Sequence, residues 1–116
     1  MPTLLPLLRS TDGGTCASTV TGAVISAEDA ERTARIFKAL GDPTRVRLLS
    51  LIAASREGEA CICDLTGPVG LSQPTVSHHM KQLVEAGLVT RQQRGRWAYY
   101  RVVTEALDAA SRALRP

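Results

Sequence analysis

Apolar residues recur at helical spacing through most of the chain after Ser26. That serine begins a capping-box-like sequence, with acidic residues in the next turn, ahead of a first helix. Gly41 is expected to end this helix in a left-handed turn, and Asp42 and Pro43 to start a second helix as N-cap and first residue. The expected core positions of the two helices are Ala30, Ala34, Phe37 and Leu40, then Val46, Leu49, Ile52 and Ala53.

The pattern continues with a turn at 55–58, a short element at 60–67 and a third amphipathic helix. Ser72 is placed to cap that helix, with Pro74 in its first turn, and Gly87 is expected to end it. The buried stripe of this helix is expected to consist of Val76, Met80, Leu83 and Val84.

From Leu88 the apolar period becomes that of a strand. Residues 88–103 predict a β-hairpin with a glycine turn at Gly95, packed on the core through its aromatic residues, and Thr104 is expected to cap a last short helix. This order of elements predicts a mainly α fold with a β-hairpin, the winged helix-turn-helix. The aromatic residues are Trp97, Tyr99 and Tyr100, and the stripe of the last helix is Leu107, Ala110 and Leu114.

Residues 1–25 carry Pro, Gly, Ser and Thr without any helical period. They predict a flexible N-terminal arm, which contains Cys16, ahead of one folded domain at 26–116. With 116 residues the chain forms one domain at most, and a core this small is often completed by dimerisation.

The net charge of +3 is unevenly distributed. Residues 72–103 contain five basic side chains and one acidic side chain, Glu85, whereas six of the other ten acids cluster at 28–31 and 57–64. A positive surface of this kind suits phosphate binding. The five basic residues are Lys81, Arg91, Arg94, Arg96 and Arg101.

The chain has three cysteines, and no apolar run approaches the roughly 20 residues that span a bilayer. A cytoplasmic protein without membrane association is expected, in which thiols stay reduced, so that the three cysteines do not form a disulfide framework. Buried apolar residues, catalytic thiols and metal ligands remain as interpretations. An oxyanion-binding enzyme loop needs an arginine six positions after the cysteine. Glycine or valine stands there after Cys16, Cys61 and Cys63, so no enzyme is expected.

Cys61 and Cys63 are separated by one residue, just before the third amphipathic helix. Side chains at i and i+2 are about 200° apart on a helix but share one face of an extended chain. Chelation by both cysteines therefore requires the start of the short element at 60–67 to be extended, frayed or pulled open. Soft thiolates select soft ions such as arsenite, antimonite, cadmium or lead, and Asp64 is placed to complete a site.

The third amphipathic helix is the one expected to enter the major groove of DNA. Side chains opposite its buried stripe are candidates for base contacts, while Lys81 and the hairpin tip are candidates for phosphate contacts. For His79, an inward-facing position as a packing or network residue is slightly preferred to a base contact. The predicted DNA-binding residues are Gln73, Thr75, Ser77, His78, Lys81, Arg94 and Arg96.

Three sequence blocks together resemble the ArsR/SmtB family of metal-responsive repressors, in its arsenic-responsive branch. They are Phe37–Arg45, Cys61–Leu65 and Ser72–Met80, within a similarity that extends from about residue 30 to 103. The resemblance implies a homodimer, formed by the first and last helices, that binds an imperfect palindrome in double-stranded operator DNA. It also implies that effector binding releases the DNA and derepresses a detoxification operon.

The resemblance places a Cys-x-Cys at Cys61 and Cys63 and a further cysteine where Thr66 stands. Cys16 is the available replacement, in its own subunit or, by analogy with arm-ligated members, in the partner's. Three sulfurs per subunit favour As(III) or Sb(III), since cadmium and zinc prefer four ligands. The family's zinc-type site on the last helix is not expected, because residues 104–116 contain no histidine. A cadmium- or lead-responsive repressor and a thiol redox sensor that pairs Cys16 with one member of the pair stay open.

Overall fold

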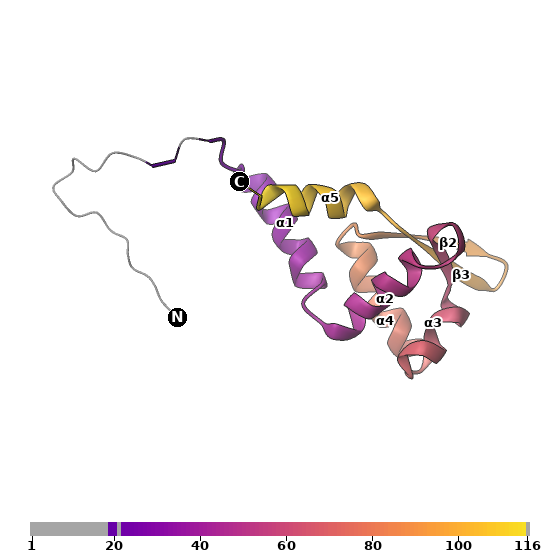
Figure 1. Ribbon diagram of the computed structural model, residues 1–116. Coiled ribbons are helices and arrows are strands. Elements are labelled where there is room, and N and C mark those ends of the chain that lie inside the picture. The colour runs from indigo at the N-terminus through magenta and orange to yellow at the C-terminus, as the bar shows by residue number, and fades with distance from the viewer. Residues whose placement is uncertain (1–18, 21, 116) are drawn as a thin grey trace.

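The computed structural model describes residues 19–20 and 22–115, and these residues form five α-helices and one three-stranded antiparallel sheet (Figure 1). This order of elements confirms the predicted winged helix-turn-helix. In chain order the elements are α1 (Ala27–Ala39), α2 (Pro43–Ala53), the 3-10 turn η1 (Arg56–Gly58), β1 (Glu59–Cys61), α3 (Ile62–Val69), α4 (Gln73–Glu85), β2 (Val89–Arg94), β3 (Trp97–Val102) and α5 (Thr104–Ala113).

The sheet has the strand order β1–β3–β2, and its hairpin is the predicted wing. Gly95 makes the turn of the hairpin with a φ of 62°, as expected from the glycine. The strand β1 was not predicted, because three residues are too few to show an alternating pattern. It pairs with β3 from Glu59 opposite Arg101 to Cys61 opposite Tyr99, and so joins the cysteine pair to the wing.

Local capping chemistry fixes the helix starts. The side chains of Ser26, Asp42 and Ser72 accept hydrogen bonds from backbone amides at 3.1, 3.1 and 3.4 Å, which confirms the three predicted N-caps. Gly87 follows α4 with a φ of 80°, also as predicted. Each of these features depends on one residue and its nearest neighbours, so the sequence alone is sufficient to predict it.

Two capping predictions were wrong. Gly41 does not adopt a left-handed conformation: α1 ends at Leu40 with right-handed angles, and the Gly41 amide donates to the Lys38 carbonyl at 3.2 Å. Because Asp42 restarts the chain as an N-cap at once, a tight right-handed turn is sufficient here. Thr104 is the first residue of α5 and not its cap, which is Val103 and makes no side-chain hydrogen bond.

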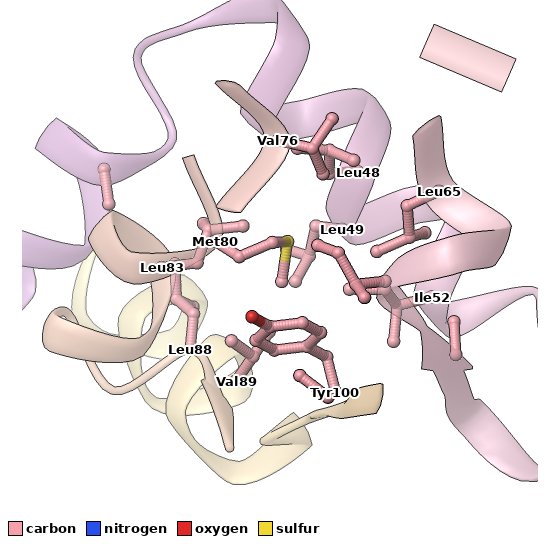
Figure 2. Close-up of a cluster of buried hydrophobic side chains, with 14 of the residues drawn as sticks. Leu48, Leu49, Ile52, Leu65, Val76, Met80, Leu83, Leu88, Val89 and Tyr100 are labelled. Carbon is pink, nitrogen blue, oxygen red and sulfur yellow. The ribbon is translucent and has the colours of Figure 1, made fainter. Parts of the chain in front are cut away.

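The core lies between α2, α3, α4 and the sheet (Figure 2). Met80 and Tyr100 meet near its centre, with leucines of α2 and α4 around them. The predicted stripe of α4 is confirmed, since three of its members are fully buried and Val84 is half-buried. The three buried members are Val76, Met80 and Leu83.

The predicted core faces of α1, α2 and α5 were wrong in part. Phe37 and Val46 are 42% and 49% exposed, whereas Ile36 and Leu48 are buried. In both helices apolar residues occupy adjacent stripes, so the period alone does not show which stripe faces inward. Of the remaining residues assigned to buried positions, Ala30, Ala34, Ala53, Leu114 and Trp97 are exposed; Leu49, Ile52, Ala110 and Tyr100 are buried; and Leu40, Tyr99 and Leu107 are half-buried.

Helices α1 and α5 lie side by side at one end of the molecule, away from α3 (Figure 1). A hollow of about 570 Å³ lies between them, and Val24, Ile25, Ile36 and Ala110 are among the residues that line it. Leu114, at the end of α5, is 71% exposed. Within the described part of the chain, no helix combines the length and apolar character needed to cross a bilayer.

Candidate metal centre and nucleic-acid interface

The cysteine pair lies at the junction of β1 and α3. Cys61 is the last residue of β1 and the N-cap of α3, with extended backbone angles (φ −75°, ψ 146°), and Cys63 lies in the first turn of the helix. The Cys63 amide donates to the Cys61 sulfur over 3.2 Å. The predicted departure from regular helix therefore occurs, and it is confined to the N-cap position.

The sulfur atoms of Cys61 and Cys63 are joined as a disulfide. We expected reduced thiols without a disulfide framework, and for a redox sensor a bond between Cys16 and one member of the pair; the bond in the structure joins the two members of the pair to each other. The reason is local, because the extended N-cap turns both side chains to one side of the chain. Cys61 is buried and Cys63 is exposed, so the pair opens to solvent on one side. Cys16 lies outside the described residues.

Asp64 adds a carboxylate next to the two sulfurs. The ligand atoms of Cys61, Cys63 and Asp64 all lie within 4.8 Å of one another, as one bound ion requires. Once the Cys61–Cys63 bond is reduced to two thiolates, this donor set suits a soft ion through its sulfurs, and it is one sulfur short of a three-thiolate site. Thr66 is half-buried in α3 and offers only a hydroxyl, which is a poor ligand for a soft ion.

The cysteine pair is in contact with the elements on both sides of it. Ile62 and Leu65 flank Cys63 in sequence and are buried in the core, and α3 packs directly on α4. Cys61 also lies opposite Tyr99 in the β1–β3 pairing. These contacts connect the pair to α4 through α3 and to the wing through β1.

Helix α4 presents a polar face opposite its buried stripe. Four of the five predicted residues on it are exposed and Ser77 is half-buried, so the structure brings all five to one helix. The Thr75 hydroxyl accepts a hydrogen bond from the N-cap hydroxyl of Ser72 at 3.0 Å, which ties it to the helix start. The four exposed residues are Gln73, Thr75, His78 and Lys81.

His79 faces inward, as interpreted from the sequence. Its Nδ1 lies 3.3 Å from Nη1 of Arg45 and 4.0 Å from a carboxylate oxygen of Asp42, with the side chain 16% exposed. Arg45 also donates to the Ala39 carbonyl at 2.5 Å. This network fastens α4 to the junction of α1 and α2.

A cleft of about 330 Å³ separates the outer face of α4 from the wing. The polar side chains that line it carry three positive charges and belong to both elements. Arg91 and Gln93 were not among the predicted site residues. The alternation of β2 is a signal for them, since both are directed to the face shared with Ala98 and Tyr100. The polar lining comprises Gln73, Ser77 and Lys81 from α4 and Arg91, Gln93 and Arg96 from the wing.

The two arginines at the tip of the wing differ in their surroundings. Arg94 forms an ion pair with Glu59 of β1, and its guanidinium lies 4.5 Å from the centre of the Tyr99 ring. The hydrogen bonds from Arg94 lower the pKa of the Glu59 carboxyl below its ordinary value, and the same bonds raise the pKa of Arg94. Arg96 makes no hydrogen bond or ion pair with any residue that the structure describes.

Comparisons with known proteins agree with this geometry. Residues 42–91 match the sequence model of the family described as bacterial regulatory protein, arsR family. The chain is 50% identical over 70 residues to the arsenic resistance transcriptional regulator ArsR1 of Pseudomonas putida, which covers 60% of this chain and 53% of that protein. The chain therefore spans about half the length of that relative.

Two further matches cover more of the related protein. An arsenical resistance operon repressor of Staphylococcus xylosus is 45% identical over 73 residues, or 63% of this chain and 67% of that protein. Among solved structures, the homodimeric winged helix-turn-helix domain of a possible ArsR-family regulator from Mycobacterium bovis superposes with a TM-score of 0.61 at 26% identity. That match covers 78% of this chain and 84% of the other.

Proposed function

Because the chain belongs to the arsR family of bacterial regulatory proteins, whose members regulate transcription and are not enzymes, we propose that it is an arsenite-responsive transcriptional repressor. In this proposal it binds double-stranded operator DNA as a homodimer in the cytoplasm and leaves the DNA when its thiolates bind As(III) or Sb(III). The observation that carries the proposal is the meeting of two sulfurs at the head of α3, the helix that packs on α4.

Dimerisation is supported by the unpartnered apolar surface at the α1–α5 end. Val24, Ile25 and Leu114 are exposed there, next to the hollow between the two helices. Burying such side chains against a second copy contributes about 25 cal/mol for each Å² of apolar surface removed from water. The name of the M. bovis protein, which describes a homodimer, supports the same arrangement.

DNA binding is assigned to the outer face of α4 and to the wing. Gln73 pairs with an adenine edge, and Thr75, Ser77 and His78 add further base contacts in the major groove. Lys81, Arg94 and Arg96 contact phosphates, which set the register and make affinity dependent on salt. The cleft between α4 and the wing supports the placement of phosphate contacts on both elements, because Lys81 of α4 and Arg96 of the wing both line it.

The effector is assigned to Cys61, Cys63 and Cys16. A bound As(III) supplies strong bonds to thiolate sulfur, and three sulfurs complete its shell. When Cys61 and Cys63 hold it, the backbone at the β1–α3 junction is drawn towards one point. The junction supports α4 through Ile62 and Leu65, so the spacing of the two recognition helices in the dimer changes.

The test is a titration of fluorescence anisotropy on DNA from the promoter of the chain's own gene, in a phosphine reductant that keeps the cysteines as thiols. Arsenite and antimonite are expected to release the DNA at lower concentration than cadmium or lead, with intact-mass spectra showing one arsenic per subunit. If only cadmium or lead released the DNA, that ion and not As(III) or Sb(III) would be the effector. Failure to bind the promoter without effector would contradict the repressor itself.

The joined sulfurs of Cys61 and Cys63 favour a second candidate, a thiol redox sensor. Peroxide would take two electrons and two protons from the pair, forming the S–S bond and releasing water. DNA release by peroxide, together with a mass loss of two protons that phosphine reverses, would support this candidate. If peroxide forms the bond while DNA affinity stays constant, the pair is oxidisable but not a redox switch.

A further inference from the structure

The guanidinium of Arg94 is held by hydrogen bonds to neighbouring side chains, although the Arg94 side chain is 42% exposed at the tip of the wing. Its Nη1 donates to one carboxylate oxygen of Glu59 at 2.9 Å and its Nη2 to the other at 2.5 Å. Nε and Nη2 also donate to the side-chain oxygen of Gln92 at 3.1 and 2.6 Å. One face of the same group lies against the Tyr99 ring.

These contacts leave little capacity for another partner. A guanidinium has five N–H donors, and the four hydrogen bonds to Glu59 and Gln92 leave a single one free. Recognition of a phosphate by an arginine is frequently bidentate and uses two parallel donors. Arg94 therefore has to give up at least one bond to Glu59 or Gln92 before it binds DNA in that way.

Glu59, the acidic partner of Arg94, is itself held firmly in place. The Glu59 side chain is only 17% exposed, and a second cation, Arg101, lies 3.6 Å from the same carboxylate oxygen that binds Nη2. Arg101 is in turn anchored by its bond to the Glu57 carbonyl at 2.9 Å. Glu59 is thus fixed in position by two arginines from β2 and β3, while Arg96, the residue after Gly95, has no acidic partner among residues 19–20 and 22–115.

We propose that Glu59 is an intramolecular competitor of the DNA phosphates for Arg94, and so a residue that limits the affinity of the protein for DNA. This inference rests on the proposed DNA-binding function and adds to it a determinant outside the DNA-facing surface. The carboxylate occupies the donors that a phosphate would use, and DNA binding at the wing includes an exchange of one anion for the other. Glu59 acts through Arg94 and makes no contact with DNA itself.

Glu59→Gln removes the charge that holds Arg94 while keeping the size of the side chain. The variant is expected to bind duplex DNA on the order of threefold more tightly at low salt, with a salt dependence steeper by about one counterion per subunit. The gain should be similar for promoter and random duplexes, because phosphates carry no sequence. The measurement is fluorescence anisotropy on both duplexes at several salt concentrations.

Two matched variants separate this exchange from a general charge effect. Glu57→Gln removes the same charge two residues away, where only the backbone carbonyl contacts Arg101, and it should leave DNA affinity near that of the parent. Glu59→Asp keeps the charge but shortens the reach to Arg94, so an intermediate gain is expected. This variant also keeps the test decisive if thermal unfolding shows that Glu59→Gln is not folded.

A double-mutant cycle with Arg94→Ala gives the final criterion. In the Arg94→Ala background, Glu59→Gln is expected to have no further effect, since the side chain that it frees is gone. An equal gain in that background, or with Glu57→Gln, would overturn the proposal in favour of net charge. Weaker or unchanged DNA binding by folded Glu59 variants would show instead that Glu59 only holds the wing in shape. Either result is distinct from a parent protein that does not bind DNA.

Discussion

The DNA-facing surface and the cysteine pair are built in opposite ways. The surface of α4 and the wing is assembled from elements packed on one core, and every residue assigned to it lies in the described part of the chain. The cysteine pair lies at the junction of a short strand and a short helix, and its proposed third ligand, Cys16, lies outside the described residues. The helix of the first region is held by the core, whereas the second region needs, in our proposal, a ligand from a distant part of the sequence.

This difference fits the proposed division of labour. A DNA-reading surface gains affinity when it is rigid before binding, because less conformational entropy is lost in the complex. An effector site can control DNA binding when the effector prefers one backbone conformation of the protein, since a ligand shifts a conformational equilibrium only by binding its two states with different affinity. The extended N-cap at Cys61 provides such a point, because it is where regular helix has not yet begun.

The sharpest test of this comparison is to disable each region separately, in reducing conditions. Cys63→Ser is expected to abolish release by arsenite while effector-free DNA affinity stays within about twofold of the parent, since an exposed side chain contributes little to stability. Lys81→Ala is expected to weaken DNA binding while arsenite still releases what binds. Anisotropy titrations give, for each variant, the DNA affinity without effector and the arsenite concentration that releases the DNA. If Cys63→Ser alone lost DNA binding, the two regions would not be separable.

The second prediction concerns the missing ligand. Cys16→Ser is expected to reduce the response to arsenite strongly, because the pair then supplies two sulfurs where As(III) takes three. Adding Thr66→Cys should restore it, since residues 63 and 66 are neighbours on one face of α3. The measurement is the arsenite concentration that releases half of the DNA. A full response in Cys16→Ser alone would show that the arm is not required and that Asp64 or water completes the site.

The success of sequence reasoning followed the same division between local and distant effects. The N-caps at Ser26, Asp42 and Ser72 and the glycine turn at Gly95 were predictable, because each depends on a few adjacent residues. The stripe of α4 was predictable because polar residues surround it on the helix and leave one possible inward face.

The features that sequence reasoning missed depend on contacts between distant residues. The choice between Ile36 and Phe37 is made by the elements that pack on α1, and both residues suit a core. The bond between Glu59 and Arg94 spans 35 positions and requires β1, a strand too short to be seen in the pattern. The bond between the sulfurs of Cys61 and Cys63 likewise depends on the extended backbone angles of Cys61. The spacing of the cysteines shows that such angles are needed for the two sulfurs to meet, but it does not show that the chain adopts them.

The third prediction separates base reading from phosphate binding within the DNA-facing surface. Gln73→Ala is expected to cost about 1–3 kcal/mol at the one base pair that it reads and to leave binding to random duplexes unchanged. The residue is exposed in the first turn of α4 and lines the cleft, so its removal should not affect folding. Competition assays with promoter variants changed at one base pair at a time provide the measurement. An equal loss of affinity for all duplexes would show that Gln73 contacts phosphates and not a base.

The smallest effect is expected at the tip of the wing, where two arginines of equal charge differ in their partners. Arg96→Ala should lower affinity for all duplexes on the order of threefold and reduce the salt dependence by about one counterion per subunit. Arg94→Ala should do the same to a lesser degree, because Glu59 already neutralises that charge in the free protein. The measurement is the DNA affinity of Arg94→Ala, Arg96→Ala and Lys81→Ala at several salt concentrations, so that their losses of affinity can be compared directly. If Arg94→Ala had the larger effect, the ion pair with Glu59 would not limit the contribution of Arg94 to DNA binding.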